Sequence, residues 1–337
     1  MPCDPQEVRG DCGTSCQSGV PGAARMIRWQ AKQVPFVYTL GEWQLLHRTI
    51  PMQAASIALG DDAGPGDVER LDPADLDKST RGYLIRMLPV DGELPIIEHF
   101  GPWLRYCFMQ YRRCYVDLGQ TFDDYVAKFS AKTRSTLRRK VKKYAEHCGG
   151  RIRFEVYQTR AEVRTFLAHA HAVSKLSYQE RLLHMGIPAT EAFIGQAGAL
   201  ADGGNLMAYV LFDGERPVSY LYCPVKDGIV GYAYLGYDPD YAKLSVGAVL
   251  HWLAIEQLFG TGRFRYLDFG EGESEHKLLF STAQQHCVDM FLFRNTLRNK
   301  LLVVPHMLLK RFSTWTGALL ERMGLKRAVR KFLRRAT

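Results

Sequence analysis

The segment from 232 to 277 constrains the fold of this chain more than any other part of the sequence. Tyrosines alternate with other residues at its start, as they would in a strand, and a turn is predicted at 238–240. An apolar helix follows over 248–258 and ends at Gly260 and Gly262. A second strand is predicted over 264–269. The segment therefore predicts a strand–helix–strand unit.

Small residues stand where this helix begins. The first turn of a helix has backbone N–H groups without internal partners and the positive end of the helix dipole, so it binds phosphate if no side chain blocks it. Ser245 and Gly247 leave that approach open. Alternatively, Ser245 only caps the helix and Gly247 only allows close packing. The spacing matches neither a Walker A loop nor the Gly-x-Gly-x-x-Gly dinucleotide fingerprint.

Several motifs around this unit resemble a known family. The motif residues are Gly236-Tyr237-Asp238-Pro239, Tyr241-Ala242, Ser245 and Gly247, followed by Asp268-Phe269-Gly270, Gly272 and Lys277. With two further segments, 122–140 and 173–182, they resemble the CelD-type (cellulose-biosynthesis-like) acetyltransferases of the GNAT acyltransferase superfamily, which are related to the Fem aminoacyltransferases. The resemblance covers about 110–295, and many members have Pro where this chain has Val246.

The resemblance implies an α/β (α+β) fold, in which helices flank a GNAT-like mixed sheet. It also implies two GNAT-like halves, of which the N-terminal one is degenerate. The local pattern predicts a short helix over 41–46 and strands over 83–90, 105–118 and 229–236. The expected parts are a disordered leader (1–25), an N-terminal half (26–150), a C-terminal acyltransferase domain (151–296) and a basic amphipathic tail (297–337). Met26 is an alternative natural start.

The resemblance further implies acyl transfer from acetyl-CoA or another acyl-CoA, without a metal. The acceptor would be an amino or hydroxyl group on a sugar, polysaccharide precursor or envelope metabolite. Acyl transfer needs a pyrophosphate site, a contact for the thioester carbonyl and a group that takes the acceptor's proton. The expected cofactor-binding residues are Leu244, Ser245, Val246, Gly247 and Ala248. The expected catalytic residues are Asp268, Glu271 and Tyr237, and the expected substrate-binding residues are Lys175, Tyr178, Gln179, Glu273 and Lys277.

Each of these residues also has a structural interpretation. Asp268 can instead pair with a neighbouring arginine, and Glu271 can be a solvated loop acid. Lys277 can simply be exposed. His251 lies on an apolar helix, where a histidine is more often structural than catalytic.

The charge is concentrated at the C-terminus. The chain of 337 residues has a net charge of +9, and 298–337 carries eleven Lys/Arg and one acid, so the rest is near −1. This distribution argues against a uniformly basic nucleic-acid binder. The apolar run 301–309 is too short to span a bilayer. The eight cysteines include no Cys-x-x-Cys pair, as expected for reduced thiols in a cytoplasmic protein.

Two basic segments leave alternatives open. A single helix is predicted over 121–147, and its cations either face solvent or bind an anionic partner, which would be tRNA in a Fem-like aminoacyl-tRNA-dependent transferase. An amphipathic helix over 318–335 either binds an anionic membrane surface, making the protein peripheral at the inner face of the membrane, or packs on the body of the protein. A third interpretation is a non-catalytic scaffold of the same fold.

Overall fold

The computed structural model of the chain describes residues 27–40, 43–176, 186–272 and 274–322. Several sequence predictions fall outside them: the leader over 1–25, the start at Met26, Tyr178, Gln179, Glu273 and the tail beyond Arg322.

Within the described residues, twelve strands form one mixed sheet in the order β1-β2-β3-β12-β5-β11-β9-β8-β7-β6, with β4 paired to β5 and β10 paired to β8. The pairs β2–β3 and β9–β11 are parallel and the others are antiparallel. The strands are β1 (Gln30–Leu40), β2 (Trp43–Ser56), β3 (Gly82–Pro89), β4 (Ile97–Phe100), β5 (Trp103–Asp117), β6 (Arg153–Tyr157), β7 (Leu206–Asp213), β8 (Arg216–Lys226), β9 (Ile229–Gly231), β10 (Tyr234–Tyr237), β11 (Tyr266–Asp268) and β12 (Ala283–Arg294).

Helices flank this sheet, which confirms the predicted fold class. The α-helices are α1 (Pro65–Glu69), α2 (Phe122–Ala127), α3 (Ala131–His147), α4 (Arg160–Ser174), α6 (Glu191–Asp202), α7 (Val246–Thr261), α8 (Glu275–Phe280) and α9 (Leu297–Arg322). Two short 3-10 helices are η1 (Pro73–Asp75) and η2 (Pro239–Leu244).

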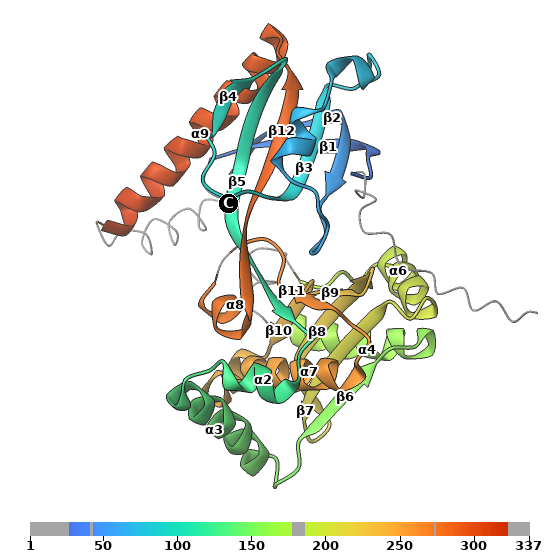
Figure 1. The fold of residues 1–337 in the computed structure, drawn as a ribbon. Coiled ribbons are helices and arrows are strands. Elements are labelled where there is room, and N and C mark those ends of the chain that lie inside the picture. Colours follow the sequence, from blue (N-terminus) through green and yellow to red (C-terminus); the bar gives the residue numbers. More distant parts are fainter. Residues whose placement is uncertain (1–26, 41–42, 177–185, 273, 323–337) are drawn as a thin grey trace, which may run out of the picture.

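The long strand β5 joins two lobes (Figure 1). Most of β5 pairs with β12 in the upper lobe, which also contains β1 to β4. Its last residues, Tyr115 to Asp117, pair with β11 in the lower lobe, which contains β6 to β11. Helix α9 lies against β1 and β5 of the upper lobe. One backbone strand therefore fixes the position of each lobe relative to the other.

The sheet of the lower lobe is covered on both faces. Alternate residues of β7 belong to two cores: Met207, Tyr209 and Leu211 face one, and Ala208 and Val210 face the other. Helices α2, α3 and α7 pack on the first face, and α4 and α6 pack on the second. Successive side chains of a strand point to opposite faces, so a strand covered on both sides is apolar throughout.

Two helix predictions are wrong. The helix predicted over 41–46 is replaced at Trp43 by strand β2, because backbone pairing with β1 extends to the end of the hairpin. The single helix predicted over 121–147 is two helices, α2 and α3. The break occurs because the Ser130 side chain accepts a hydrogen bond from the Thr133 N–H and caps a new helix.

The predicted domain limits cut across these contacts. Helices α2 and α3 precede the limit at 150 but pack against α7, and β12 follows that limit but lies between β3 and β5. The limits, and the interpretation of the N-terminal half as a degenerate second copy, stay predictions.

Candidate functional site

The parallel strands β9 and β11 separate directly after a short pairing. Their last paired residues are Gly231 and Asp268, and the N–H of Tyr232 donates to the Asp268 carbonyl at 2.9 Å. Beyond this bond the segment after β9 continues as β10, which pairs with β8. The segment after β11 turns away at Gly270, which has a φ of 69°. The strand predicted over 229–236 is therefore two strands. Among the described strands, β10 pairs with β8 alone. Its other edge therefore borders the opening that forms where β10 and β11 separate.

Helix α7 begins beside this opening with two free backbone donors. Ser245 has a left-handed conformation (φ 56°, ψ 38°), and its carbonyl accepts from the N–H groups of Ala248 at 2.9 Å and Val249 at 3.1 Å. The N–H groups of Val246 and Gly247 donate to no described residue. Unpaired N–H groups at the positive end of a helix dipole are an anion site. The five predicted cofactor residues, 244–248, all lie at this junction.

The space above the helix start is open. A Cβ atom placed on Gly247 would meet only the Tyr237 ring, at 3.6 Å, which is ordinary van der Waals contact. No close packing inside the described residues therefore requires glycine here. Tyr237 is 45% exposed, so its phenol is accessible beside the free N–H groups. The structure thus brings one predicted catalytic residue next to the predicted phosphate site.

The loop that precedes α7 is anchored by its acids and by basic side chains. Asp238 is buried, accepts from the Asp240 N–H at 3.0 Å and forms an ion pair with Arg216 at 2.6 Å. The Lys143 ammonium of α3 donates to the Lys243 carbonyl at 3.1 Å. The basic face of α3 therefore lies next to the start of α7.

A buried ion pair lies at the end of β11. The Arg113 guanidinium of β5 donates to both carboxylate oxygens of Asp268, at 3.2 Å from Nε to Oδ1 and 2.5 Å from Nη2 to Oδ2. Another Arg113 nitrogen donates to the Ile57 carbonyl at 2.9 Å, and the Gly270 N–H donates to Asp268 at 2.8 Å. Burial lowers the pKa of Arg113, but the Asp268 carboxylate more than offsets this and raises it. Through Arg113, the end of β11 is thereby connected to β5 and to the Ile57 carbonyl, which directly follows β2.

Glu271 and Lys277 lie in the same group of charges. Glu271 forms an ion pair with Arg86 of β3, which also contacts the buried carboxylate of Asp289 at 3.2 Å. Burial, and secondly the Asp289 charge, raises the pKa of Glu271 above its ordinary value. The Lys277 ammonium donates to the carbonyls of Glu271 at 2.6 Å and Gly272 at 3.3 Å, and burial lowers its pKa. We call this group the junction cluster; its members are Arg86, Arg113, Asp268, Glu271, Lys277 and Asp289.

The arginines and Asp289 of the junction cluster were not among the predicted site residues. Arg86 and Arg113 lie in strands that the sequence predicts, where charged residues interrupt apolar runs. A charged residue within a buried strand needs a partner, and that signal could have identified both.

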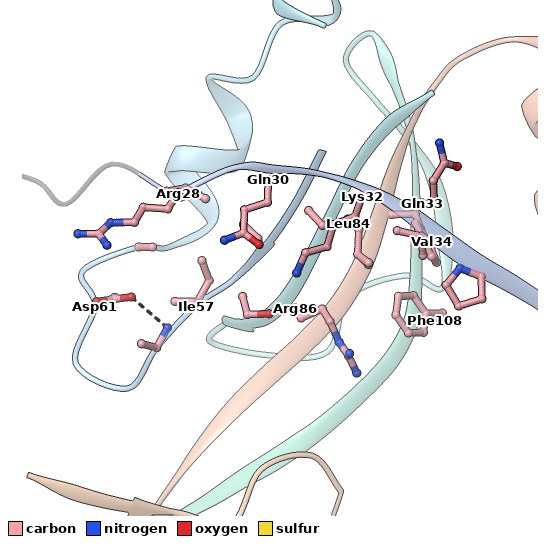
Figure 2. A pocket seen from close by; sticks show the side chains of 18 of the residues that line it. Arg28, Gln30, Lys32, Gln33, Val34, Ile57, Asp61, Leu84, Arg86 and Phe108 are labelled. Atoms are coloured by element: carbon pink, nitrogen blue, oxygen red, sulfur yellow. Dashed lines mark hydrogen bonds between the residues drawn. The ribbon is translucent and has the colours of Figure 1, made fainter. Parts of the chain in front are cut away.

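A cavity of about 810 Å³ is lined in part by Arg86 of the junction cluster (Figure 2). Strands β1 to β3 line it from the upper lobe, and the turn between β8 and β9 lines it from the lower lobe. Its volume is in the range of small-molecule sites. Its charged lining residues are Arg28, Lys32, Arg86, Lys226, Asp61 and Asp227. Arg86 belongs both to this lining and to the ion pair with Glu271, so one side chain connects the cavity with Glu271.

Lys175 is not part of this arrangement. It is exposed after α4, and its side chain forms no hydrogen bond or ion pair with a described residue. Among the described residues, no group of His, Cys, Asp and Glu has a geometry that could hold a metal ion.

His251 is buried under this site, as its structural interpretation predicts. Its ring stacks on Phe280 with a centroid distance of 4.5 Å, and its Nδ1 lies 2.5 Å from Nε2 of His276. Its own Nε2 has no hydrogen-bond partner in the described part of the chain. Burial lowers the pKa of His251 far below its ordinary value and lowers that of His276 to about 4. Both imidazoles are therefore neutral at pH 7.

This histidine pair predicts a loss of stability in acid. The unfolded histidines bind protons near pH 6.5. In the folded protein the pKa of His276 is lowered to about 4 and that of His251 is also far below its ordinary value, so the unfolded state holds more protons below pH 6.5. The free energy of unfolding should therefore fall as the pH drops through this window. Thermal melts from pH 7.5 to 4.5 should show a smaller decrease for His251→Phe, which keeps the stacking with Phe280. Parallel decreases in the two proteins would contradict this assignment.

Comparison with known proteins identifies the domain. Residues 131–278, from α3 to α8, match the family model described as "Acetyltransferase (GNAT) domain". A search of curated proteins found no match. Residues 131–278 therefore form a GNAT acetyltransferase domain, which supports an acyltransferase.

Three solved structures of low sequence identity are similar to this chain. The C-terminal domain of a provisionally named lysylphosphatidylglycerol synthetase from Agrobacterium fabrum has 12% identity and a TM-score of 0.50, over 85% of this chain and 90% of that one. FemX has 11% identity and a TM-score of 0.49, over 82% and 90%. L-PGS from Bacillus licheniformis has 14% identity and a TM-score of 0.44, over 66% and 72%. The first shares the overall fold of this chain. The narrower CelD-type likeness still depends on the sequence motifs.

Proposed function

We propose that the enzyme transfers an acyl group directly from acetyl-CoA, or another acyl-CoA, to an amine or hydroxyl. The acceptor is a sugar, a polysaccharide precursor or a related envelope metabolite. The observation that carries the proposal is the pair of free N–H groups at Val246 and Gly247, beside the opening between β10 and β11. They lie within the segment that matches the acetyltransferase domain.

The residues present fit an acyl-CoA donor. The N–H groups of Val246 and Gly247 would bind its phosphates, and the absence of a side chain at Gly247 keeps the approach open. The cations of α3, which reaches this loop through Lys143, would add attraction for the phosphates. The free edge of β10 would offer backbone donors to the thioester carbonyl. When bound, the donor supplies an activated acyl group.

Glu271 is our candidate for the general base. The acceptor would lose a proton to the Glu271 carboxylate as its nitrogen or oxygen bonds to the acyl carbon, while the carbon–sulfur bond breaks. The phenol of Tyr237, beside Gly247, would donate a proton to the departing sulfur. A raised pKa suits Glu271 to this task, and Arg86 connects it to the cavity, which we propose as the acceptor site. Asp268 is a weaker candidate because Arg113 already donates to both its carboxylate oxygens.

Four of the five described cysteines favour direct transfer over an acyl-enzyme. Burial raises the pKa of Cys107 and Cys287 to about 11 and raises those of Cys148 and Cys223 as well. A thiol that stays protonated at neutral pH is a poor nucleophile. Mass-spectrometric detection of an acylated cysteine during turnover would contradict direct transfer.

Replacing Glu271 should slow the reaction. Glu271→Gln is expected to lower kcat about 100-fold or more and to remove the rise of the rate with pH, because the amide cannot accept a proton. Gln still accepts a hydrogen bond from Arg86, so folding should be preserved. Release of free thiol from acetyl-CoA, with a panel of amino sugars, measures the rate. Glu275→Gln, at an exposed position on α8, is the control, and a wild-type rate in Glu271→Gln would exclude this base.

A second donor is an aminoacyl-tRNA. The basic face of α3 carries exposed cations next to the start of α7; they are Lys132, Arg138, Arg139, Lys142 and Lys143. Such a face suits a polyanionic donor as well as the phosphates of coenzyme A. Filter retention of labelled tRNA, without binding of acyl-CoA, would favour the aminoacyl-tRNA donor.

We also propose that the enzyme works in the cytoplasm at the inner face of the membrane, held there by the basic tail over 318–335. None of the helices in the described residues is long and apolar enough to cross a membrane. A basic amphipathic tail binds anionic lipid without crossing it. The salt dependence of vesicle binding tests this.

A further inference from the structure

Helix α9 is fixed to the upper lobe by one face. Leu302 and Val303 are buried in the core of that lobe. The His306 ring lies 2.7 Å from the Tyr106 hydroxyl and 3.0 Å from the Val37 carbonyl, and the Tyr38 hydroxyl donates to the Leu302 carbonyl at 2.7 Å. These bonds hold the helix in one rotational position, so its other face is presented to the outside (Figure 1).

The outward face carries a continuous apolar line. Six of its large hydrophobic side chains are between 37% and 73% exposed. They follow one another at intervals of three or four residues, so they lie on one side of the helix over about 27 Å. We call them the outer stripe; they are Leu297, Leu301, Val304, Leu308, Phe312 and Trp315.

This arrangement differs from ordinary surface hydrophobicity. Exposed apolar residues that occur singly need no explanation, whereas a contiguous patch marks an interaction surface. Of the eleven large hydrophobics that are exposed in the described chain, six belong to the outer stripe. The interior of the upper lobe does not need them, because α9 is already packed through its opposite face.

The charges around the outer stripe indicate which partner covers it. Helix α9 contains Arg298, Lys300, Arg311 and Arg322, and Lys310, whose ammonium donates to the Phe108 carbonyl, against one acid, Glu321. Six further cations and no acid follow in 323–337. A second copy placed on the outer stripe would bring these cations against their own equivalents. An anionic bilayer would bind the apolar line and the surrounding cations together.

We propose that the outer stripe of α9 lies on an anionic membrane surface, with the helix parallel to the bilayer. Leucine and aromatic side chains enter the boundary between headgroups and acyl chains, and the flanking cations contact anionic headgroups. This surface is distinct from the tail over 318–335 and does not depend on the proposed acyl transfer. It would place the upper lobe against the membrane and leave the helices of the lower lobe away from it (Figure 1).

Vesicle flotation with the full-length protein tests the outer stripe. The vesicles contain phosphatidylcholine with 30% phosphatidylglycerol, or phosphatidylcholine alone. We compare wild type, the stripe variant Leu301→Ser/Leu308→Ser/Trp315→Ser, and the control Leu45→Ser/Leu46→Ser, which changes exposed leucines of β2. All five positions are exposed, so thermal melts should show folded proteins.

Wild type and control should float with the anionic vesicles. The stripe variant should partition at least about 10-fold more weakly, because it lacks three of the apolar side chains whose transfer from water into the bilayer favours binding. Equal flotation of wild type and stripe variant, or no flotation of wild type, would overturn the proposal. So would a wild-type dimer in light scattering that becomes monomeric in the stripe variant. Because flotation needs no turnover, its result is separate from the success or failure of the proposed acyl transfer.

Discussion

The Gly247→Trp variant is expected to bind acyl-CoA at least 100-fold more weakly than wild type, while its melting temperature stays close to that of wild type. The indole would fill the space above the free N–H groups of Val246 and Gly247. Hydrogen bonds to a charged partner are worth about 1.5–3 kcal/mol each, so losing two costs about 100-fold or more in affinity. Isothermal titration with acetyl-CoA measures the effect.

The same helix provides the control. A Cβ atom on Gly260, near the other end of α7, would meet nothing within 4 Å. Gly260→Trp therefore adds the same side chain to the same helix without approaching the proposed phosphate site, and it should bind acetyl-CoA as wild type does. Unchanged affinity in Gly247→Trp would refute the site.

The second large effect concerns stability. Asp268→Asn should lower the free energy of unfolding by about 3–5 kcal/mol, because removing one partner of a buried ion pair leaves the other charge uncompensated. Arg113 is only 3% exposed, so water cannot replace the lost carboxylate. Urea unfolding followed by circular dichroism measures the change.

A double variant separates charge from shape. Arg113→Met/Asp268→Leu removes both charges and retains much of the volume, so it should recover a large part of the stability lost in Asp268→Asn. Glu215→Gln, at an exposed position, is the control for losing one acid and should unfold as wild type does. If the urea midpoint of Asp268→Asn equals that of wild type, the buried ion pair between Arg113 and Asp268 does not stabilise the fold.

Local patterns predicted much of the lower lobe. The Asp213-Gly214 turn between two apolar runs is a local signal for the β7–β8 hairpin. The apolar run that ends at Gly260 and Gly262 predicted α7, with small residues at its start. These signals are visible because hairpins and helices form between residues that are close in sequence.

The junction cluster could not be predicted in this way. Arg113 and Asp268 are 155 positions apart, and Arg86 and Glu271 are 185 apart. The first contact depends on the pairing of β11 with β5, and the second on the position of β12 between β3 and β5. No local pattern encodes these long-range pairings. The outer stripe of α9 was missed for another reason: apolar residues occupy both faces of that helix, so its sequence lacks a clear amphipathic period.

The central claim is that the free N–H groups at the start of α7 bind the phosphates of the donor. The most direct measurement is an NMR titration of ¹⁵N-glycine-labelled protein with acetyl-CoA, in which the loss of one peak in Gly247→Ala assigns the Gly247 amide. A hydrogen bond to phosphate should move the Gly247 resonance downfield in a saturable manner, while Gly260 at the other end of α7 stays in place. A Gly247 resonance that does not move at saturating acetyl-CoA would contradict the account.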